Sequence, residues 1–333
     1  MKASLTFAAV GTGASVQDLG RFGHRRIGVP WSGALAPELL IIANHLVGNA
    51  AGAAAIECFS GGQILCVAGA PLRLAVAGEA RLELESGASS RPLAAWQSHR
   101  LLPGECLHIG PIHDGRVVVV AVAGLEAKHV LGSASAHTRS GLGGHWLRAG
   151  DSLRCAAVTT APERQLPDPP IYSSSEPYRV IAGPQAEHFD PTAWQNFLGT
   201  EYRISPAADR MGMRLEGPRL PHRNAESAEI VSDAIVPGAI QVPGHGQPIV
   251  LLADAQTAGG YPKIATIISA DLPRLATRKP GDTLRFVAVD AQSGEQAARE
   301  AATQLRMRLD SLRSLTPEGI DLAALYPEEP AAD

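Results

Sequence analysis

The sequence predicts a mainly β protein with a few helices, and three observations indicate this fold class. Short runs that alternate in polarity or are rich in β-branched residues recur along the chain, separated by glycine or proline, as is typical of strands. Helical patterns are few. Strands and helices do not alternate strictly, which argues against a doubly wound parallel sheet and favours a closed or curled antiparallel β architecture.

The individual elements follow from these patterns. The N-terminal segment reaches Gly11 too soon for a secretory core region, so we interpret it as the first strand. Three helices are expected, over 35–47, 186–198 and 296–312, the last with Ser293 and Gln296 as a capping box. Further strands are expected at 63–69, 72–78, 81–85, 116–124, 178–182, 229–236, 247–253, 264–269 and 283–289.

Two domains are predicted, joined by a segment rich in proline and serine. Such a composition resists packing and favours a semi-rigid linker. The linker covers 161–177, between an N-terminal domain at 1–160 and a C-terminal domain at 178–333 that ends in a helix. A short echo, GDSLR at 150–154 and GDTLR at 281–285, is consistent with two equivalent halves.

Composition excludes several classes of partner. The chain has 333 residues, 45% of them hydrophobic, which is enough for a substantial core. With 19% charged residues and a net charge of −4, it has no electrostatic footprint for nucleic acid or an anionic membrane surface. No apolar run is long enough to cross a bilayer. We therefore expect a cytoplasmic protein that binds neither nucleic acid nor membrane.

The cysteines are widely separated, and most have apolar neighbours. This pattern predicts buried thiols in a reducing compartment. A zinc site would need a tighter group of ligands, so no metal site is predicted on this chain. The cysteines are Cys58, Cys66, Cys106 and Cys155.

The segment 251–267 gathers functional side chains at one bend. Gly259 and Gly260 lack Cβ atoms, so the backbone there can take positive φ or allow a ligand or strand to approach closely. Pro262 restricts its own φ and biases Tyr261 toward an extended conformation, which aims Tyr261 and Lys263 reproducibly. The alternative is a hairpin with a bulge whose charges face water. Asp254 and Gln256 complete the group.

A second polar segment lies near the N-terminus, at 15–33. It contains too many glycines and prolines for a helix and too many charges for a core, so we expect an ordered loop over a scaffold. Its polar side chains are Gln17, Asp18, Arg21, Arg25, Arg26 and Ser32.

Six sequence blocks, in order along the chain, carry a family resemblance. The chain resembles the allophanate hydrolase subunit 2 family, also called the carboxyltransferase subdomain C and D family, which includes the C subunit of the bacterial ATP-dependent 5-oxoprolinase. The blocks are VQDLGR at 16–21, GVPWSGA at 28–34, DRMGMRLEG at 209–217, PGAIQVP at 237–243, QPIVLLAD at 247–254 and QTAGGYPKIATIISADLP at 256–273.

The resemblance implies a fold, partners and a reaction. The fold would be a pair of cyclophilin-like β-barrel domains. The partners would be a sister protein resembling allophanate hydrolase subunit 1, which is the B subunit of 5-oxoprolinase, and the further A subunit of that enzyme. The reaction would use ATP with magnesium to open a small amide or lactam, such as that of 5-oxo-L-proline. No covalent biotin is expected, because the Ala-Met-Lys-Met type of biotin-accepting motif is absent.

Lactam hydrolysis assigns expected roles to the polar side chains. Phosphorylation of the carbonyl oxygen activates a resonance-stabilised lactam, so cations must bind phosphate or carboxylate. Carboxylates would orient these cations, hold magnesium or act as a base, glutamines would read an amide, and a tyrosine would donate to an oxyanion. The catalytic candidates are Asp18, Arg21, Asp254, Gln256, Tyr261 and Lys263. The substrate-binding candidates are Gln17, Arg25, Ser32, Gly33, Arg210, Gln241, Gly259 and Gly260.

Each candidate also has a structural interpretation. Arg21 and Asp18 can pair at the base of a loop, and Arg210 can pair with Asp209 or Glu216. The hydroxyl of Ser32 would cap the helix that begins near Leu35 rather than act as a nucleophile.

Several positions depart from the family pattern by losing polar groups. Alanine stands where the family usually has aspartate, histidine and threonine, at Ala36, Ala255 and Ala258, and the loop 132–136 reads GSASA in place of GSRST. Three hypotheses follow: a hydrolase subunit whose missing groups come from partner chains, a binding or regulatory module with little catalysis, and a carboxyltransferase subunit of a urea carboxylase-like system.

Overall fold

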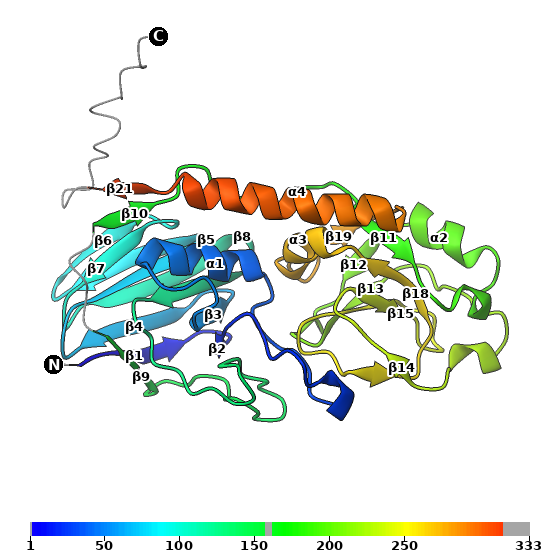
Figure 1. The fold of residues 1–333 in the computed structure, drawn as a ribbon, viewed down its shortest axis with the longest axis horizontal. Coiled ribbons are helices and arrows are strands. Elements are labelled where there is room, and N and C mark those ends of the chain that lie inside the picture. The colour runs from blue at the N-terminus through cyan, green and yellow to red at the C-terminus, as the bar shows by residue number, and fades with distance from the viewer. Residues whose placement is uncertain (1, 157–161, 316–333) are drawn as a thin grey trace, which may run out of the picture.

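The computed structural model describes residues 2–156 and 162–315, and the fold is mainly β. One large sheet comes from the first half of the chain and a second from the other half, while a long helix, α4 (Ala291–Asp310), lies along one side of both (Figure 1). The first sheet forms a half-barrel and the second a nearly closed barrel. The expected mainly β class with two barrel-like units is therefore confirmed.

The N-terminal sheet is built around one long strand, β8. It pairs antiparallel with β3, β4 and β5, and β1 joins β4 to β9 at one edge. The two strands expected at 72–78 and 81–85 form a single bulged strand, because register shifts between Ala77 and Leu82 let the pairing with β8 continue past Gly78. The strands are β1 Ala3–Val10, β2 Ala14–Gln17, β3 Ala55–Phe59, β4 Gln63–Ala68, β5 Leu72–Ser86, β6 Ser89–Leu93, β7 Ser98–Leu101, β8 Cys106–Val122 and β9 Ser152–Cys155.

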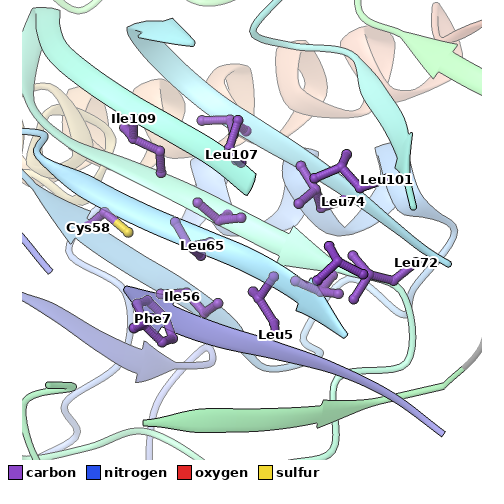
Figure 2. Close-up of a cluster of buried hydrophobic side chains, with 14 of the residues drawn as sticks. Leu5, Phe7, Ile56, Cys58, Leu65, Leu72, Leu74, Leu101, Leu107 and Ile109 are labelled. Atoms are coloured by element: carbon purple, nitrogen blue, oxygen red, sulfur yellow. The ribbon is translucent and has the colours of Figure 1, made fainter. Parts of the chain in front are cut away.

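Alternation gives this sheet two apolar faces. One face turns inward into the half-barrel, where side chains such as Leu5, Phe7 and Leu65 pack with almost no exposure (Figure 2). The other face is covered by α1 (Pro37–Val47), whose leucines and isoleucine pack on small residues of β5 and on β8. Burial on both faces explains why β8 is apolar throughout its second half.

The C-terminal sheet runs in the order β19-β12-β13-β16-β15-β18-β11-β20. Its core includes a group of aromatic side chains, with the rings of Phe197 and Phe286 stacked 4.6 Å apart between centroids. Leu35 and Val117 from the first half also pack into this core, so the two sheets share buried surface. The strands are β11 Tyr178–Ala182, β12 Tyr202–Ile204, β13 Gly212–Glu216, β15 Ala239–Gln241, β16 Ile249–Leu251, β18 Lys263–Ile267, β19 Thr283–Leu284 and β20 Phe286–Ala288, with a separate pair of β14 Asp233–Ala234 and β17 Ala258–Gly259.

The proline-rich segment is not a free spacer. Within it, β10 (Glu163–Gln165) pairs antiparallel with β21 (Arg313–Leu315), which follows α4, and Leu166 and Tyr172 are buried beside α1. The chain thus returns from the second sheet to the first along α4 (Figure 1). The prediction that 161–177 resists packing was wrong for residues 162–177, which are the part of this segment that the structure describes. Helix α4 contacts both halves of the chain. The domain bounds themselves stay a prediction.

Three local expectations need correction. Helix α4 begins at Ala291 with Asp290 as its N-cap, whose side chain accepts from the Ser293 amide, so the capping box at Ser293 and Gln296 was wrong. The region 186–198 divides into a short 3₁₀ turn, η2 (Ala186–His188), and α2 (Ala193–Gly199). Most of 229–236 is irregular, and only β14 is a strand. The other helices are η1 Arg25–Ile27, η3 Glu226–Ala228, η4 Ser269–Asp271 and α3 Leu272–Ala276.

The cysteines also differ from expectation. Cys58 and Cys155 are buried free thiols, as predicted. Cys66 on β4 and Cys106 on β8 lie directly opposite each other across the antiparallel pair and form a disulfide. Four thiols were part of the argument for a reducing compartment, so the cytoplasmic location loses that support. Within the described residues, no helix has the length and apolar character that a bilayer crossing requires.

The disulfide makes a testable prediction. Replacing Cys66 and Cys106 together by serine should lower the free energy of unfolding by about 2–4 kcal/mol, because the bond closes a loop in the unfolded chain. Urea denaturation measures the change. A reductant should destabilise the wild type and leave the double variant unchanged. Recovery of both cysteines as alkylated thiols under non-reducing peptide mapping would show that the bond does not form.

Candidate functional site

Arg21 is fully buried and is engaged by backbone carbonyls. Its Nε donates to the Val130 carbonyl at 2.9 Å and its Nη2 to the Ser135 carbonyl at 2.7 Å. Burial lowers the pKa of the guanidinium, and the charges of Asp18 and Asp254 oppose that shift. Arg21 therefore holds the 130–135 loop against the N-terminal segment through Nε and Nη2, while its buried Nη1 has no partner among the described residues.

Asp18 completes this loop anchor. Its Oδ1 accepts from the Ser133 hydroxyl at 2.7 Å and from the Ser135 hydroxyl at 2.5 Å. Its Oδ2 accepts from the Ala134 amide at 2.7 Å. Gly20 also donates its amide to Oδ1, at 2.8 Å. Four donors occupy the carboxylate, which leaves little capacity for a metal ion or a substrate proton.

Gln17 belongs to the same anchor. Its Nε2 donates to the Ser15 hydroxyl at 2.9 Å and to the Ala136 carbonyl at 3.0 Å. Arg21 and Asp18 do not form the direct pair that was expected. Instead, both side chains form hydrogen bonds with residues of the 130–135 loop. Gln17, Asp18 and Arg21 thus give the 132–136 loop its shape, and this is the loop where alanines replace the family's usual polar residues.

A second buried cluster centres on Arg210. Its Nη1 donates to Glu57, its Nε donates to Asp254 at 2.9 Å, and its Nη2 donates to the Gly33 carbonyl at 2.6 Å and to Asp254 at 3.1 Å. Burial by itself would lower the pKa of Arg210. The negative charges of Glu57 and Asp254 outweigh this effect, so the pKa of Arg210 is raised. The expected partners Asp209 and Glu216 were wrong, because the turn before strand β13 directs Arg210 toward the first half of the chain.

Sequence reasoning missed Glu57. It lies in the middle of β3 with no exposed surface, and its Oε2 accepts from the Leu35 amide at 2.7 Å. Burial raises the pKa of Glu57, while Arg210 and the Leu35 amide act in the opposite direction. The available signal was a lone acid within an apolar strand, which favours a buried ion pair.

Ser32 and Gly33 link the two halves through their backbone. Ser32 donates its amide to the Ala253 carbonyl at 3.1 Å and has a φ of 54°. Gly33 has a φ of 89°, and a Cβ there would lie 2.9 Å from the Gly20 nitrogen, so glycine is required. Ser32 does not cap the following helix: the N-cap of α1 is Ala36, which makes no side-chain hydrogen bond.

The glycine corner, defined as residues 256–263 with Gln185, Asp233 and Gln241, is a third polar group. Lys263 is buried, and its Nζ binds Asp233 Oδ2 at 2.8 Å, although half of the Asp233 side chain is exposed. Gln185 donates to the same carboxylate at 3.2 Å and accepts from the Lys263 amide at 3.1 Å. The hydrogen bond from Lys263 is the main cause that lowers the pKa of Asp233.

Two glutamine amides converge on Gly259. A Cβ at this position would lie 2.9 Å from Gln241 Nε2 and 3.3 Å from Gln256 Nε2, so the glycine makes room for both. Its φ is not positive, and close approach is the property that the structure uses. The hairpin alternative was wrong, since β17 pairs with β14 instead of with the strand that follows it. Tyr261 is 42% exposed.

Arg25 connects the early segment to the glycine corner. Its Nη2 donates to the Ile235 carbonyl and to the Thr257 carbonyl, the latter at 3.5 Å, and its guanidinium lies over the Trp31 ring at 4.8 Å. Burial lowers the pKa of Arg25. The two polar segments therefore meet, and the hydrogen bonds between them come from Arg25 and from the Ser32 amide.

The candidates thus fall into three clusters rather than one cleft. The loop anchor contains Gln17, Asp18 and Arg21. The buried centre contains Gly33, Arg210 and Asp254. The glycine corner contains Gln241, Gln256, Gly259, Gly260, Tyr261 and Lys263, and Arg25 reaches its edge.

Comparison with known proteins identifies the family. The family described as the carboxyltransferase domain, subdomain A and B, matches residues 27–288. The chain is 32% identical to the 5-oxoprolinase C subunit of Haemophilus influenzae, over 92% of this chain and 96% of that protein. It is 34% identical to the 5-oxoprolinase C subunit of Escherichia coli, over 89% and 94%. The chain belongs to the carboxyltransferase domain family. The resemblance is confirmed, with subdomains A and B in place of C and D.

A solved structure supports the carboxyltransferase domain fold. The Kluyveromyces lactis urea carboxylase matches with a TM-score of 0.82 and 23% identity, over 95% of this chain. This chain corresponds to 30% of that longer protein. At this identity the likeness establishes the fold alone.

The residues of this carboxyltransferase domain do not fit a magnesium site. Asp18 and Asp254 are occupied by hydrogen-bond donors, and Asp233 binds Lys263. Among residues 2–156 and 162–315, no three acids, histidines or cysteines are grouped so as to hold a metal ion.

The alanine departures occupy different environments. Ala36 is the buried N-cap of α1, where an aspartate would satisfy helix amides. Ala255 is buried in a small apolar cluster with Ile235 and Leu251. Ala258 is exposed on β17. Two of the three lost polar groups would thus have been buried, in positions that now contribute only packing.

The buried centre predicts a large stability effect. Arg210→Met should lower the free energy of unfolding by about 3–5 kcal/mol, because it leaves two buried carboxylates without their counter-ion. Urea denaturation at neutral pH measures this. The control is Arg285→Met, which removes an exposed ion pair with Glu201 and should change stability little. Equal midpoints for the two variants would contradict the role assigned to Arg210.

Glu57 predicts a specific pH dependence. Its pKa is raised from 4.5 by burial, so the folded protein holds this proton more tightly than the unfolded chain. Stability therefore falls as pH rises above about 4.5 toward the folded pKa. Glu57→Gln removes that loss, so its stability relative to wild type should increase between about pH 4.5 and pH 7. Urea denaturation of the wild type and of Glu57→Gln at these two pH values tests this. A stability of the variant relative to wild type that increases as pH falls would contradict the raised pKa of Glu57.

Proposed function

We propose that this chain is the C subunit of an ATP-dependent 5-oxoprolinase, which converts 5-oxo-L-proline, ATP and water to L-glutamate, ADP and phosphate. The observation that carries the proposal is similarity over nearly the whole length of two proteins that bear this name. Like them, it would act within an assembly, with partners resembling the A and B subunits of that enzyme.

The glycine corner has the chemistry that such a substrate needs. A lactam presents one carbonyl acceptor and one N–H donor, and the exposed amide of Gln256 can match both types of group, while Gln241 is buried beside it and donates to the Tyr261 carbonyl at 3.3 Å. The substrate carboxylate, or a phosphorylated carbonyl oxygen, carries negative charge. Lys263 can bind that charge by exchanging Asp233, which is half exposed, for the substrate anion. Tyr261 is exposed beside them as a further donor.

The buried clusters hold this corner in place but supply no free acid or base. Asp18 is occupied by four donors, and Asp254 is bound twice to Arg210. We therefore assign nucleotide binding, magnesium coordination and general-base catalysis to the partner subunits. In this arrangement the chain contributes substrate recognition and anion binding.

The same observation favours a second candidate function. The carboxylates of Asp18 and Asp254 are occupied by hydrogen-bond donors, and Ala36 and Ala255 place buried methyl groups where the family usually has polar side chains. The chain therefore also suits a binding or regulatory module that pairs with its sister subunit. The carboxyltransferase alternative is favoured by membership of the carboxyltransferase domain family and by the shared fold with urea carboxylase. Measurement of turnover in the assembled complex separates these functions.

The test is substrate-dependent ATP hydrolysis by the purified complex. Lys263→Met should reduce 5-oxoproline-dependent turnover by roughly 10²–10³-fold, as for loss of one preorganised oxyanion donor. The matched control is Lys279→Met, a lysine that donates to the carbonyls of Ile112 and His113, outside the corner. Both variants should copurify with the partners.

Two outcomes would count against the hydrolase function. A well-folded wild-type complex that hydrolyses no ATP in response to 5-oxoproline would leave the binding module. Equal activity in the Lys263 and Lys279 variants would remove the glycine corner from the reaction.

A further inference from the structure

A strap of chain, residues 229–236, lies directly over the glycine corner. Its strand β14 pairs antiparallel with β17 at the outer edge of the second half (Figure 1). Ile230 donates its amide to the Gly260 carbonyl at 2.8 Å, and Ile235 donates its amide to the Thr257 carbonyl at 3.1 Å. A Cβ on either glycine of the corner would press on the strap, 2.6 Å from Ile235 Cδ1 or 3.2 Å from the Ile230 carbonyl oxygen. The paired glycines therefore make room for the strap.

Little apolar burial holds the strap in place. All of residues 229–236 are described, and only Ile235 among them has a buried side chain. Val231 and Val236 are 94% and 45% exposed. A segment with few buried apolar contacts opens at low free-energy cost. The strap can thus open locally while the sheet beneath it stays folded.

The polar contact that closes the strap is a carboxylate site that already holds a carboxylate. Asp233 Oδ2 accepts from Lys263 Nζ at 2.8 Å and from Gln185 Nε2 at 3.2 Å. Gln185 Oε1 accepts from the Lys263 amide at 3.1 Å, and this bond turns the Gln185 amide so that its Nε2 faces the same carboxylate. A cation and an oriented amide donor that converge on one oxygen are the groups that a small carboxylate ligand needs.

Charge restricts what can replace Asp233. The Lys263 side chain is only 4% exposed, and a buried ammonium group that loses its counter-ion is strongly destabilised. A ligand that opens the strap must therefore bring an anion of its own. A neutral lactam ring alone does not meet this requirement.

We propose that Lys263 and Gln185 bind the carboxylate of the substrate, and that Asp233 occupies this site until the substrate displaces it and the strap opens. The identity of the substrate rests on the proposed function, on which the carboxylate is that of 5-oxo-L-proline. Asp233 is then a specificity-determining residue, because it excludes from the corner any lactam that lacks an anionic group.

The probes are 5-oxo-L-proline and 2-pyrrolidinone, which is the same lactam ring without the carboxylate. Added to the full-length chain alone, 5-oxo-L-proline should bind saturably in calorimetric titration. It should also accelerate amide hydrogen exchange in a peptide that covers 229–236, because its carboxylate releases the strap. 2-Pyrrolidinone should do neither.

Variants separate a competing carboxylate from a structural support. Asp233→Asn removes the competing charge with little change in size, so 5-oxo-L-proline should bind roughly tenfold or more tightly to a site that is no longer occupied most of the time. Removal of a merely structural carboxylate would weaken binding or leave it unchanged. The matched control is Glu201→Gln, which removes an exposed acid paired with Arg285 and should leave the dissociation constant unchanged.

A second variant tests Gln185. Its amide binds Asp233 and the substrate alike, so its effect is measured after the competitor has been removed. In the Asp233→Asn background, Gln185→Leu should weaken 5-oxo-L-proline binding by roughly tenfold, the usual worth of a hydrogen bond to a charged group. An unchanged dissociation constant would remove Gln185 from the site.

Three results would overturn the proposal. These are unchanged or weaker binding by folded Asp233→Asn, equal binding of 2-pyrrolidinone, and absence of 5-oxo-L-proline binding to both folded chains. If Asp233→Asn does not fold, the two probes and the hydrogen exchange of the wild type decide. A complex that hydrolyses ATP with 5-oxoproline, while Asp233→Asn gains no affinity, would exclude the displacement and keep the hydrolase. A complex without turnover, whose isolated chain shows the tighter binding, would do the reverse.

Discussion

The buried guanidinium of Arg210 is the interaction on which the arrangement of the two halves depends. It joins Glu57 on a strand of the first sheet to Asp254, which follows a strand of the second, and also binds the Gly33 carbonyl in the early loop. Planar, forked donors suit such a junction, because one side chain can satisfy several acceptors in fixed directions. Burial makes each of these bonds costly to break, so the junction is rigid.

The loop anchor extends this junction toward the surface. Asp18 and Arg21 together occupy the amides, hydroxyls and carbonyls of the 130–136 loop, and Arg21 also interacts with the charge of Asp254. Charges that in a sequence look catalytic are here used to order irregular backbone. This is a physical necessity, because a loop with no strand or helix bonds must satisfy its buried polar groups with side chains.

The glycine corner, where we propose that the substrate binds, lies at the edge of this frame. Arg25 reaches it from the first half, and Lys263 and Gln241 come from adjacent strands of the second sheet. Helix α4 lies along both sheets (Figure 1) and packs beside α1.

The sequence alone determined the fold class and the family, and it singled out most of the polar side chains that form the three clusters. Alternation predicted strands such as β4 and β11, because side-chain period and burial are local properties. It also drew attention to Gly33 and Gly259, where close backbone approach excludes a Cβ. Only the tertiary structure decided which polar groups meet. Arg21 binds carbonyls over a hundred residues away, and Glu57 proved to be the partner of Arg210. Ion pairing depends on distances between strands that are remote in sequence, and no local pattern encodes these.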